Sequence, residues 1–120
     1  MFRESRAKWP TNVKNKTTPN LNLKIKKNEV AITFINHATF SIQLNGIYIL
    51  TDPIWSDRAS PISWVGPKRV RKPGVKFEEL PKIDLILISH NHYDHLDIDT
   101  LKKLDKRFSP KVFVPIGDKD

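Results

Sequence analysis

Residues 83–97 read IDLILISHNHYDHLD and carry the strongest structural signal of the chain. Residues 84–88 form a run dominated by apolar side chains, which predicts a strand buried on both faces. Three of the chain's four histidines and one aspartate follow within six positions; they are His90, His92, Asp94 and His95. Imidazole nitrogen and carboxylate oxygen are the ligands that a borderline metal such as zinc accepts. The stretch therefore predicts a buried strand that ends in a metal site.

Strand geometry indicates how these side chains could meet. His90 and His92 project to the same side of an extended segment, because side chains alternate. A turn after His92 then places Asp94 and His95 beside them, facing a second metal. The alternative is a polar loop whose histidines happen to be exposed. The clustering of histidines in a chain that uses few of them favours the metal site.

Upstream of this motif, the clearest local signal is FSIQLNGIYIL at residues 40–50. Two alternating runs joined by Asn45-Gly46 predict a β-hairpin with a type I′ turn, since both turn residues tolerate positive φ. A β-prone run at residues 30–35 precedes it. Residues 52–81 contain five prolines, a density that predicts a long irregular excursion from the sheet. We expect its Trp55 and Trp64 to anchor that loop to the core.

Downstream, helical spacing of apolar residues predicts a helix that begins after Asp97 or Asp99 and ends near Phe108. Residues 111–116 are predicted to form another strand. A hairpin followed by strand, helix and strand indicates a mixed α/β fold. The domain is expected to span residues 29–120. Residues 1–28 are predicted to be a polar, basic leader that either wraps the domain or is mobile.

Composition limits the functional classes. The chain has 120 residues, a net charge of +8 and no cysteine, which excludes disulfides and thiolate metal sites. No apolar window approaches the roughly 18 residues of a membrane span, and no secretory signal is evident. We expect a cytoplasmic protein, with attachment at a membrane surface left open. Four cations could hold phosphate or anionic headgroups or could form a solvated loop; they are Lys68, Arg69, Arg71 and Lys72.

The His-x-His-x-Asp-His motif resembles the signature of the metallo-β-lactamase superfamily. Other segments resemble one branch of it, the N-acylphosphatidylethanolamine-hydrolysing phospholipase D-like group and its bacterial relatives. These segments are INHATF at 35–40, LTDPIWSDRASP at 50–61, WVGPKRVRKPG at 64–74 and LPKID at 80–84. The resemblance covers about residues 30–117. It implies the first half of an αββα sandwich with a mixed sheet.

The resemblance also implies roles for individual residues. His90 and His92 would bind one metal, Asp94 and His95 a second, and Asp52 would support the site from behind. Asp94 is also the candidate catalytic carboxylate, and zinc is the implied metal. The implied reaction is hydrolysis of a phosphodiester, such as that of a phospholipid, by hydroxide that the metals activate. His37, between two early strands, either lines the pocket or packs against backbone.

A complete site of this superfamily needs three further ligands, and the sequence has no histidine after His95. Three hypotheses follow. The chain is an N-terminal fragment of a hydrolase and inactive alone; or its site is completed in trans, by self-association or by a C-terminal half encoded separately. In the third, it is a non-enzymatic module that binds phosphate or nucleic acid. Nucleases share the metal motif, but residues 52–74 favour the phospholipase-like branch, so nucleic acid is the less favoured partner.

Overall fold

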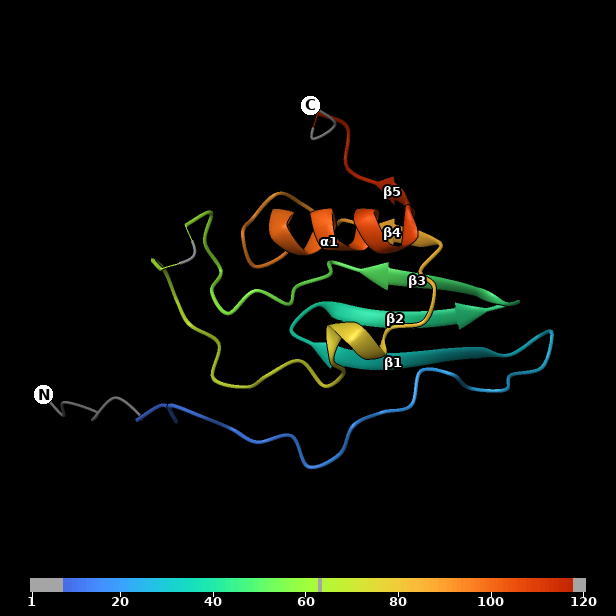
Figure 1. The fold of residues 1–120 in the computed structure, drawn as a ribbon, viewed down its shortest axis with the longest axis horizontal. Coiled ribbons are helices and arrows are strands. Elements are labelled where there is room, and N and C mark those ends of the chain that lie inside the picture. Colours follow the sequence, from blue (N-terminus) through green and yellow to red (C-terminus); the bar gives the residue numbers. More distant parts are fainter. Residues whose placement is uncertain (1–7, 63, 118–120) are drawn as a thin grey trace, which may run out of the picture.

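The computed structural model describes residues 8–62 and 64–117, which are built around one five-stranded sheet (Figure 1). Its strands lie in the order of the sequence: β1 (Val30–Asn36), β2 (Thr39–Leu44), β3 (Ile47–Thr51), β4 (Leu85–Leu87) and β5 (Lys111–Phe113). β1, β2 and β3 pair antiparallel, whereas β4 pairs parallel with both β3 and β5. The sheet is therefore mixed, as an α/β fold of this type requires.

The β2–β3 connection is the two-residue turn Asn45-Gly46, with Leu44 opposite Ile47. Both residues have positive φ, 49° and 80°, which is the backbone conformation of a type I′ turn. The turn fixes the register in which Ser41 pairs with Leu50. The beginning of β2 and the end of β3 consequently lie side by side, at the edge of the sheet where the histidine motif begins.

Helix α1 (Ile98–Phe108) and the short 3₁₀ helix η1 (Phe77–Glu79) lie over one face of the sheet (Figure 1). Apolar side chains between these helices and the sheet form the core. The buried members are Leu21, Ile35, Leu50, Val75, Leu80, Ile83, Ile86, Ile88 and Leu104. Leu21 comes from the leader, whose described part runs irregularly and joins the loop through a hydrogen bond from Val13 N to Val70 O.

Asp97 fixes both the start of α1 and the path of the proline-rich loop. Its carboxylate accepts hydrogen bonds from the backbone and hydroxyl of Thr100, at 3.1 and 2.6 Å. It also accepts from Trp55 N, at 3.2 Å, and from Ser56 N and Oγ, at 2.9 and 2.8 Å. Burial raises the pKa of Asp97, but these hydrogen bonds outweigh it and hold the pKa below its ordinary value.

The opposite face of the sheet is apolar and exposed. Its large side chains include Ile32, which is 65% exposed, Phe34 and Phe113, both 54%, and Leu87, 39%. The prediction that residues 84–88 are buried on both faces is therefore wrong for Leu87, because no layer covers that face within the described residues. The strand predicted at 111–116 is also shorter, ending at Phe113.

The two tryptophans of the loop differ. Trp55 donates from Nε1 to Val75 O and packs edge-on against Phe77, 5.9 Å between ring centroids. Trp64 is 77% exposed, so the prediction that it anchors the loop to the core is wrong. None of the helices among the described residues is long and apolar enough to cross a membrane.

Candidate metal centre

The histidine motif begins at His90, three residues after the end of β4, and turns back on itself. His92 O accepts hydrogen bonds from His95 N, at 2.9 Å, and Leu96 N, at 2.7 Å. This turn brings His95 back against His90, with 4.0 Å between their ring centroids. The rings of His90 and His92 are 4.6 Å apart. All four motif side chains predicted to bind metal therefore belong to one cluster at the end of β4.

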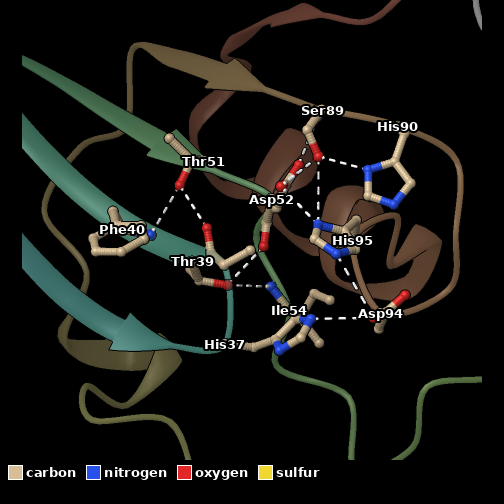
Figure 2. A network of polar contacts seen from close by, with 11 residues as sticks. His37, Thr39, Phe40, Thr51, Asp52, Ile54, Ser89, His90, Asp94 and His95 are labelled. Carbon is tan, nitrogen blue, oxygen red and sulfur yellow. Dashed lines mark hydrogen bonds and ion pairs between the residues drawn. The ribbon is translucent and has the colours of Figure 1, made fainter.

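Asp52 lies behind this cluster because β3 and β4 are parallel and end at the same edge of the sheet. Its Oδ1 accepts from Ser89 N at 2.7 Å, and its Oδ2 accepts from Ser89 Oγ at 2.7 Å and His95 Nδ1 at 2.9 Å (Figure 2). Burial raises the pKa of Asp52, but the bonds from His95 and Ser89 outweigh burial and lower it. Asp52 is thus a buried, ionised acceptor that orients the motif.

These hydrogen bonds decide which histidine nitrogen is available to a metal. A carboxylate only accepts, so His95 carries a proton on Nδ1 and, when neutral, a lone pair on Nε2. That Nε2 faces Asp94, 3.6 Å from Oδ2. The Ser89 hydroxyl donates its proton to Asp52, so it accepts a hydrogen bond from His90 Nδ1, 2.8 Å away. With its proton on Nδ1, a neutral His90 has its lone pair on Nε2. Such outer partners are typical of histidines that bind metals.

His37 reaches the same cluster from the turn between β1 and β2. Its Nε2 lies 3.1 Å from Asp94 Oδ2, and its ring is 5.0 Å from that of His95. One ligand atom from each of His37, Asp94 and His95 can be chosen so that all lie within 4.8 Å of one another. Burial raises the pKa of Asp94, but hydrogen bonds and the nearby His95 and His37 lower it.

Threonines hold the His37 turn in place. Thr39 Oγ1 donates to Asp52 O at 2.6 Å, and Thr51 Oγ1 donates to Ala38 O at 2.7 Å (Figure 2). Thr51 Oγ1 also accepts from Phe40 N at 3.0 Å. Sequence reasoning missed Thr39, Thr51 and Ser89. The available signal was position, since all three are adjacent or nearly adjacent in sequence to a residue that had been singled out.

The four predicted phosphate contacts are not equivalent. Arg69 is half-buried and donates to two backbone carbonyls, from Nε to Ser56 O at 2.9 Å and from Nη2 to Ile54 O at 3.3 Å. Burial lowers its pKa, while the carboxylates of Asp57 and Asp97 raise it. The other three side chains are exposed; they are Lys68, Arg71 and Lys72.

A cleft of about 230 Å³ lies beside the histidine cluster. Its walls carry His37 and Asp94 on one side and Lys68 and Arg69 on the loop side. The carboxylate and imidazole groups described above, with Nε2 of His95 freed by the Asp52 contact, match the donor chemistry of a divalent metal. The cleft opens onto His37 and Asp94 of that cluster.

The sequence of this chain is similar to a known protein family and to proteins with named activities. The family described as "Beta-lactamase superfamily domain" matches residues 48–117. N-acyl-phosphatidylethanolamine-hydrolyzing phospholipase D 1 of Caenorhabditis elegans is 47% identical over 87 residues. The chain belongs to the metallo-β-lactamase superfamily. The identity to the worm protein places it in the N-acylphosphatidylethanolamine-hydrolysing phospholipase D-like branch.

The matches cover unequal shares of the proteins. The worm match covers 71% of this metallo-β-lactamase-type chain but 24% of the worm protein. The mitochondrial N-acyl-phosphatidylethanolamine-hydrolyzing phospholipase D of Saccharomyces cerevisiae is 45% identical over 75 residues, 62% of this chain and 16% of its own length. Igni18, a solved metallo hydrolase from Ignicoccus hospitalis, is 28% identical with a TM-score of 0.47, covering 70% of this chain and 31% of Igni18. The chain thus spans a quarter or less of the length of the worm and yeast relatives.

Proposed function

We propose that this chain supplies the front half of the metal centre of a hydrolase that cleaves a phosphodiester bond in a phospholipid. The observation that carries the proposal is the convergence of His90, His92, Asp94 and His95 on one cluster backed by Asp52. The activity for which the worm and yeast relatives are named supports N-acylphosphatidylethanolamine as the substrate class.

Three groups of residues have different proposed roles: binding the metal, orienting its ligands and attracting the phosphate. His90, His92, Asp94 and His95 would hold one or two zinc ions, which supply Lewis-acid polarisation of a phosphoryl oxygen and an activated water. Asp52 and Ser89 orient the imidazole rings, and the negative charge of Asp52 favours binding of a cation at Nε2 of His95. Lys68 and Arg69 line the cleft, where their charges attract the substrate's phosphate. Arg69 also donates to two backbone carbonyls of the loop.

The ligand count favours completion of the site by further residues. Catalytic zinc sites usually keep three protein ligands for each ion, and the four motif residues give two for each of two ions. We therefore propose that hydrolysis needs ligands from another segment, either continuous with this one or from a partner chain. The 120 residues alone are expected to show no phosphodiesterase activity above that of free metal.

A chimera tests this proposal directly. The matched segment of this chain would replace the corresponding 87 residues of the worm protein, and hydrolysis of N-acylphosphatidylethanolamine vesicles would be measured with added zinc. We expect activity that disappears with a chelator and with His92→Ala, while the exposed neighbour variant Tyr93→Phe keeps it. A folded chimera with no hydrolysis, beside an active worm protein, would contradict the proposal.

A further inference from the structure

A groove of about 550 Å³ lies at the end of β1, the edge strand past which the leader runs (Figure 1). It is lined by the end of β1, by leader residues between positions 15 and 19, and by loop residues between positions 69 and 74. It adjoins the cleft beside the histidine cluster but shares only Asn36, His37 and Arg69 with it. Cavities that hold small ligands usually measure about 300–1,000 Å³, so the groove is large enough for a ligand of its own.

Hydrogen bonds to backbone atoms hold the sides of this groove together. Val13 N donates to Val70 O at 2.6 Å, and Asn15 Nδ2 donates to two further carbonyls of the loop, at 3.1 and 3.0 Å. Gly74 N donates to Ile35 O at 2.8 Å and so ties the loop to β1. A β-carbon at position 74 would lie 3.2 Å from that same oxygen, so this close approach favours glycine. The shape of the groove is therefore fixed by the backbone rather than by long, flexible side chains.

The ionisable side chains that line the groove are all basic among the described residues. They are Lys16, His37, Arg69 and Arg71. In contrast, the cavity of about 640 Å³ between the loop and α1 is lined by three aspartates as well as three lysines and arginines. Cations that no carboxylate compensates raise the local concentration of anions in a concave surface. The groove therefore favours a negatively charged ligand.

The three permanent cations of the groove have different surroundings. Lys16 and Arg71 are exposed, and neither forms an ion pair within the part of the chain that the structure describes. Arg69 is half-buried, and its two bonds to backbone carbonyls fix the position of its guanidinium group. A phosphate monoester carries a charge of about −1.5 to −2 and has three acceptor oxygens, whereas a carboxylate has one charge and two oxygens. Three cations therefore match a phosphate group better than a carboxylate.

We propose that this groove is a second anion site, which binds the phosphate group of an organic phosphate monoester without a metal ion. Lys16, Arg69 and Arg71 donate to the phosphate oxygens. Phe34 and Val70 line the same groove and are 54% and 37% exposed, so they contact the organic part of the ligand. The inference goes beyond the proposed hydrolase, because no residue of the histidine motif lines this groove.

The proposal separates the four cations that the sequence suggested as phosphate contacts. Arg71 belongs to the groove alone, and Lys68 belongs to the cleft beside the histidine cluster. Arg69 lines both. Lys72 lines neither of them and instead faces a cavity that also contains Glu78. Neighbouring residues of equal charge are thus expected to differ in their effect on phosphate binding.

The test is a titration of the full 120-residue chain, labelled with ¹⁵N and kept in a chelator so that no metal contributes. The ligands are glycerol 3-phosphate and dihexanoylphosphatidic acid below its micelle concentration, which share a phosphate monoester and differ in their acyl chains. We expect the amide resonances of Thr17 and Gly74, which line the groove, to shift, while Gly46 in the β2–β3 turn does not. Binding of the lipid at least about 10-fold tighter identifies a lipid as the source, because apolar burial adds affinity; equal affinities identify a soluble phosphate ester.

Charge-neutral variants identify the residues responsible. Lys16→Gln and Arg71→Gln should each weaken binding of the phosphate monoester by about 5-fold or more, because each removes a charge-assisted hydrogen bond. Lys14→Gln and Lys72→Gln are the matched controls, since both remove one positive charge from neighbouring positions outside the groove. Salt at about 0.15 M screens such distant charges, so the controls should change the affinity less than about 2-fold. All four substitutions replace exposed side chains, and an unchanged Gly46 resonance verifies that each variant is folded.

An absence of shifts at Thr17 and Gly74 with both ligands would overturn the inference. Equal losses of affinity in the control and groove variants would overturn it too, because binding would then follow the net charge of the chain rather than a built site. The chimera experiment decides the proposed function separately, since the titration contains neither metal nor a hydrolysis step. An active chimera together with a groove that binds no phosphate monoester would retain the function and reject the second site.

Discussion

Asp52 and Asp97 are two buried carboxylates that accept hydrogen bonds in the same way but from different kinds of partner. They are 5% and 7% exposed, and each accepts several hydrogen bonds that lower its pKa despite burial. Asp97 accepts its hydrogen bonds from Trp55, Ser56 and Thr100, which hold the loop and the helix in place. Asp52 accepts one of its hydrogen bonds from His95, a candidate metal ligand.

Burial and a lowered pKa therefore do not by themselves identify a functional carboxylate. What distinguishes Asp52 is the identity of its partner, because a bond to His95 Nδ1 sets the nitrogen that faces Asp94. Asp97 instead joins the loop after β3 to the first turn of α1. Changing each residue should therefore affect different properties, and the contrast between them can be measured.

The largest effect is expected on stability for Asp97→Ala. The change leaves the donors of Ser56 and Thr100 without their acceptor and removes the helix cap. It also removes one of the two acceptors of Trp55 N, which keeps its bond to Thr100 Oγ1. Hydrogen bonds to a charged group contribute about 1.5–3 kcal/mol each, so we expect a loss of at least about 3 kcal/mol in the free energy of unfolding. Urea denaturation followed by circular dichroism measures it.

Asp99→Ala is the matched control, since Asp99 is an exposed acidic residue in the first turn of the same helix. Its loss should cost less than about 1 kcal/mol. Equal losses in the two variants would mean that the Asp97 network contributes little beyond the helix dipole. The comparison between Asp52 and Asp97 would then have no energetic basis.

Asp52→Asn should reverse the pattern, with a smaller effect on stability and a larger one on metal binding. Asparagine keeps one acceptor oxygen and tolerates the left-handed φ of 37° at this position. It removes the charge beside His95 Nδ1, and loss of such outer partners lowers metal affinity by about 10–100-fold. Competition titration with Zn²⁺ measures the change, and urea denaturation gives the stability.

Asp97→Asn serves as the control in the metal titration, because its carboxylate contacts none of the four motif residues in the described structure. It should leave Zn²⁺ affinity within about 3-fold of wild type, well short of the outer-partner effect. If Asp52→Asn also leaves affinity unchanged, Asp52 supports the fold rather than the ligands.

The parts of this molecule that sequence predicted well are those set by neighbouring residues. Asn45-Gly46 connects two paired strands, and α1 begins after Asp97 and ends at Phe108 as its spacing indicated. The clustering of the motif histidines also followed from local geometry. These features depend on contacts within a few positions, where propensity and periodicity carry enough information.

The parts that sequence did not predict depend on residues far apart in the chain. The approach of His37 to Asp94 joins positions 57 apart, and the role of Ser89 depends on Asp52, 37 positions away. Leu87 was misjudged for a related reason, because its exposure depends on which layer covers the sheet rather than on its own strand. No local pattern encodes such distances, so the family resemblance had to supply the role of Asp52.

The smallest expected effect is the pH dependence of the Asp97 network. Its pKa is lowered in the folded chain, so the carboxylate binds its proton more readily when unfolded. The resulting stabilisation is fully present above the ordinary aspartate pKa of about 3.9 and is lost as pH falls through the lower, folded value. The free energy of unfolding of wild type minus that of Asp97→Asn should therefore be constant from about pH 5 to 7 and shrink in more acidic solution.

Taking this difference cancels the other carboxylates whose pKa values are lowered, Asp52 and Asp94, because both proteins contain them. Protonation leaves a carboxyl group that still accepts hydrogen bonds, so the change should be smaller than that caused by Asp97→Ala. Urea denaturation at a series of pH values from 7 downward measures it. A difference that grows as pH falls would mean that burial, which raises the pKa, outweighs the bonds from Ser56 and Thr100.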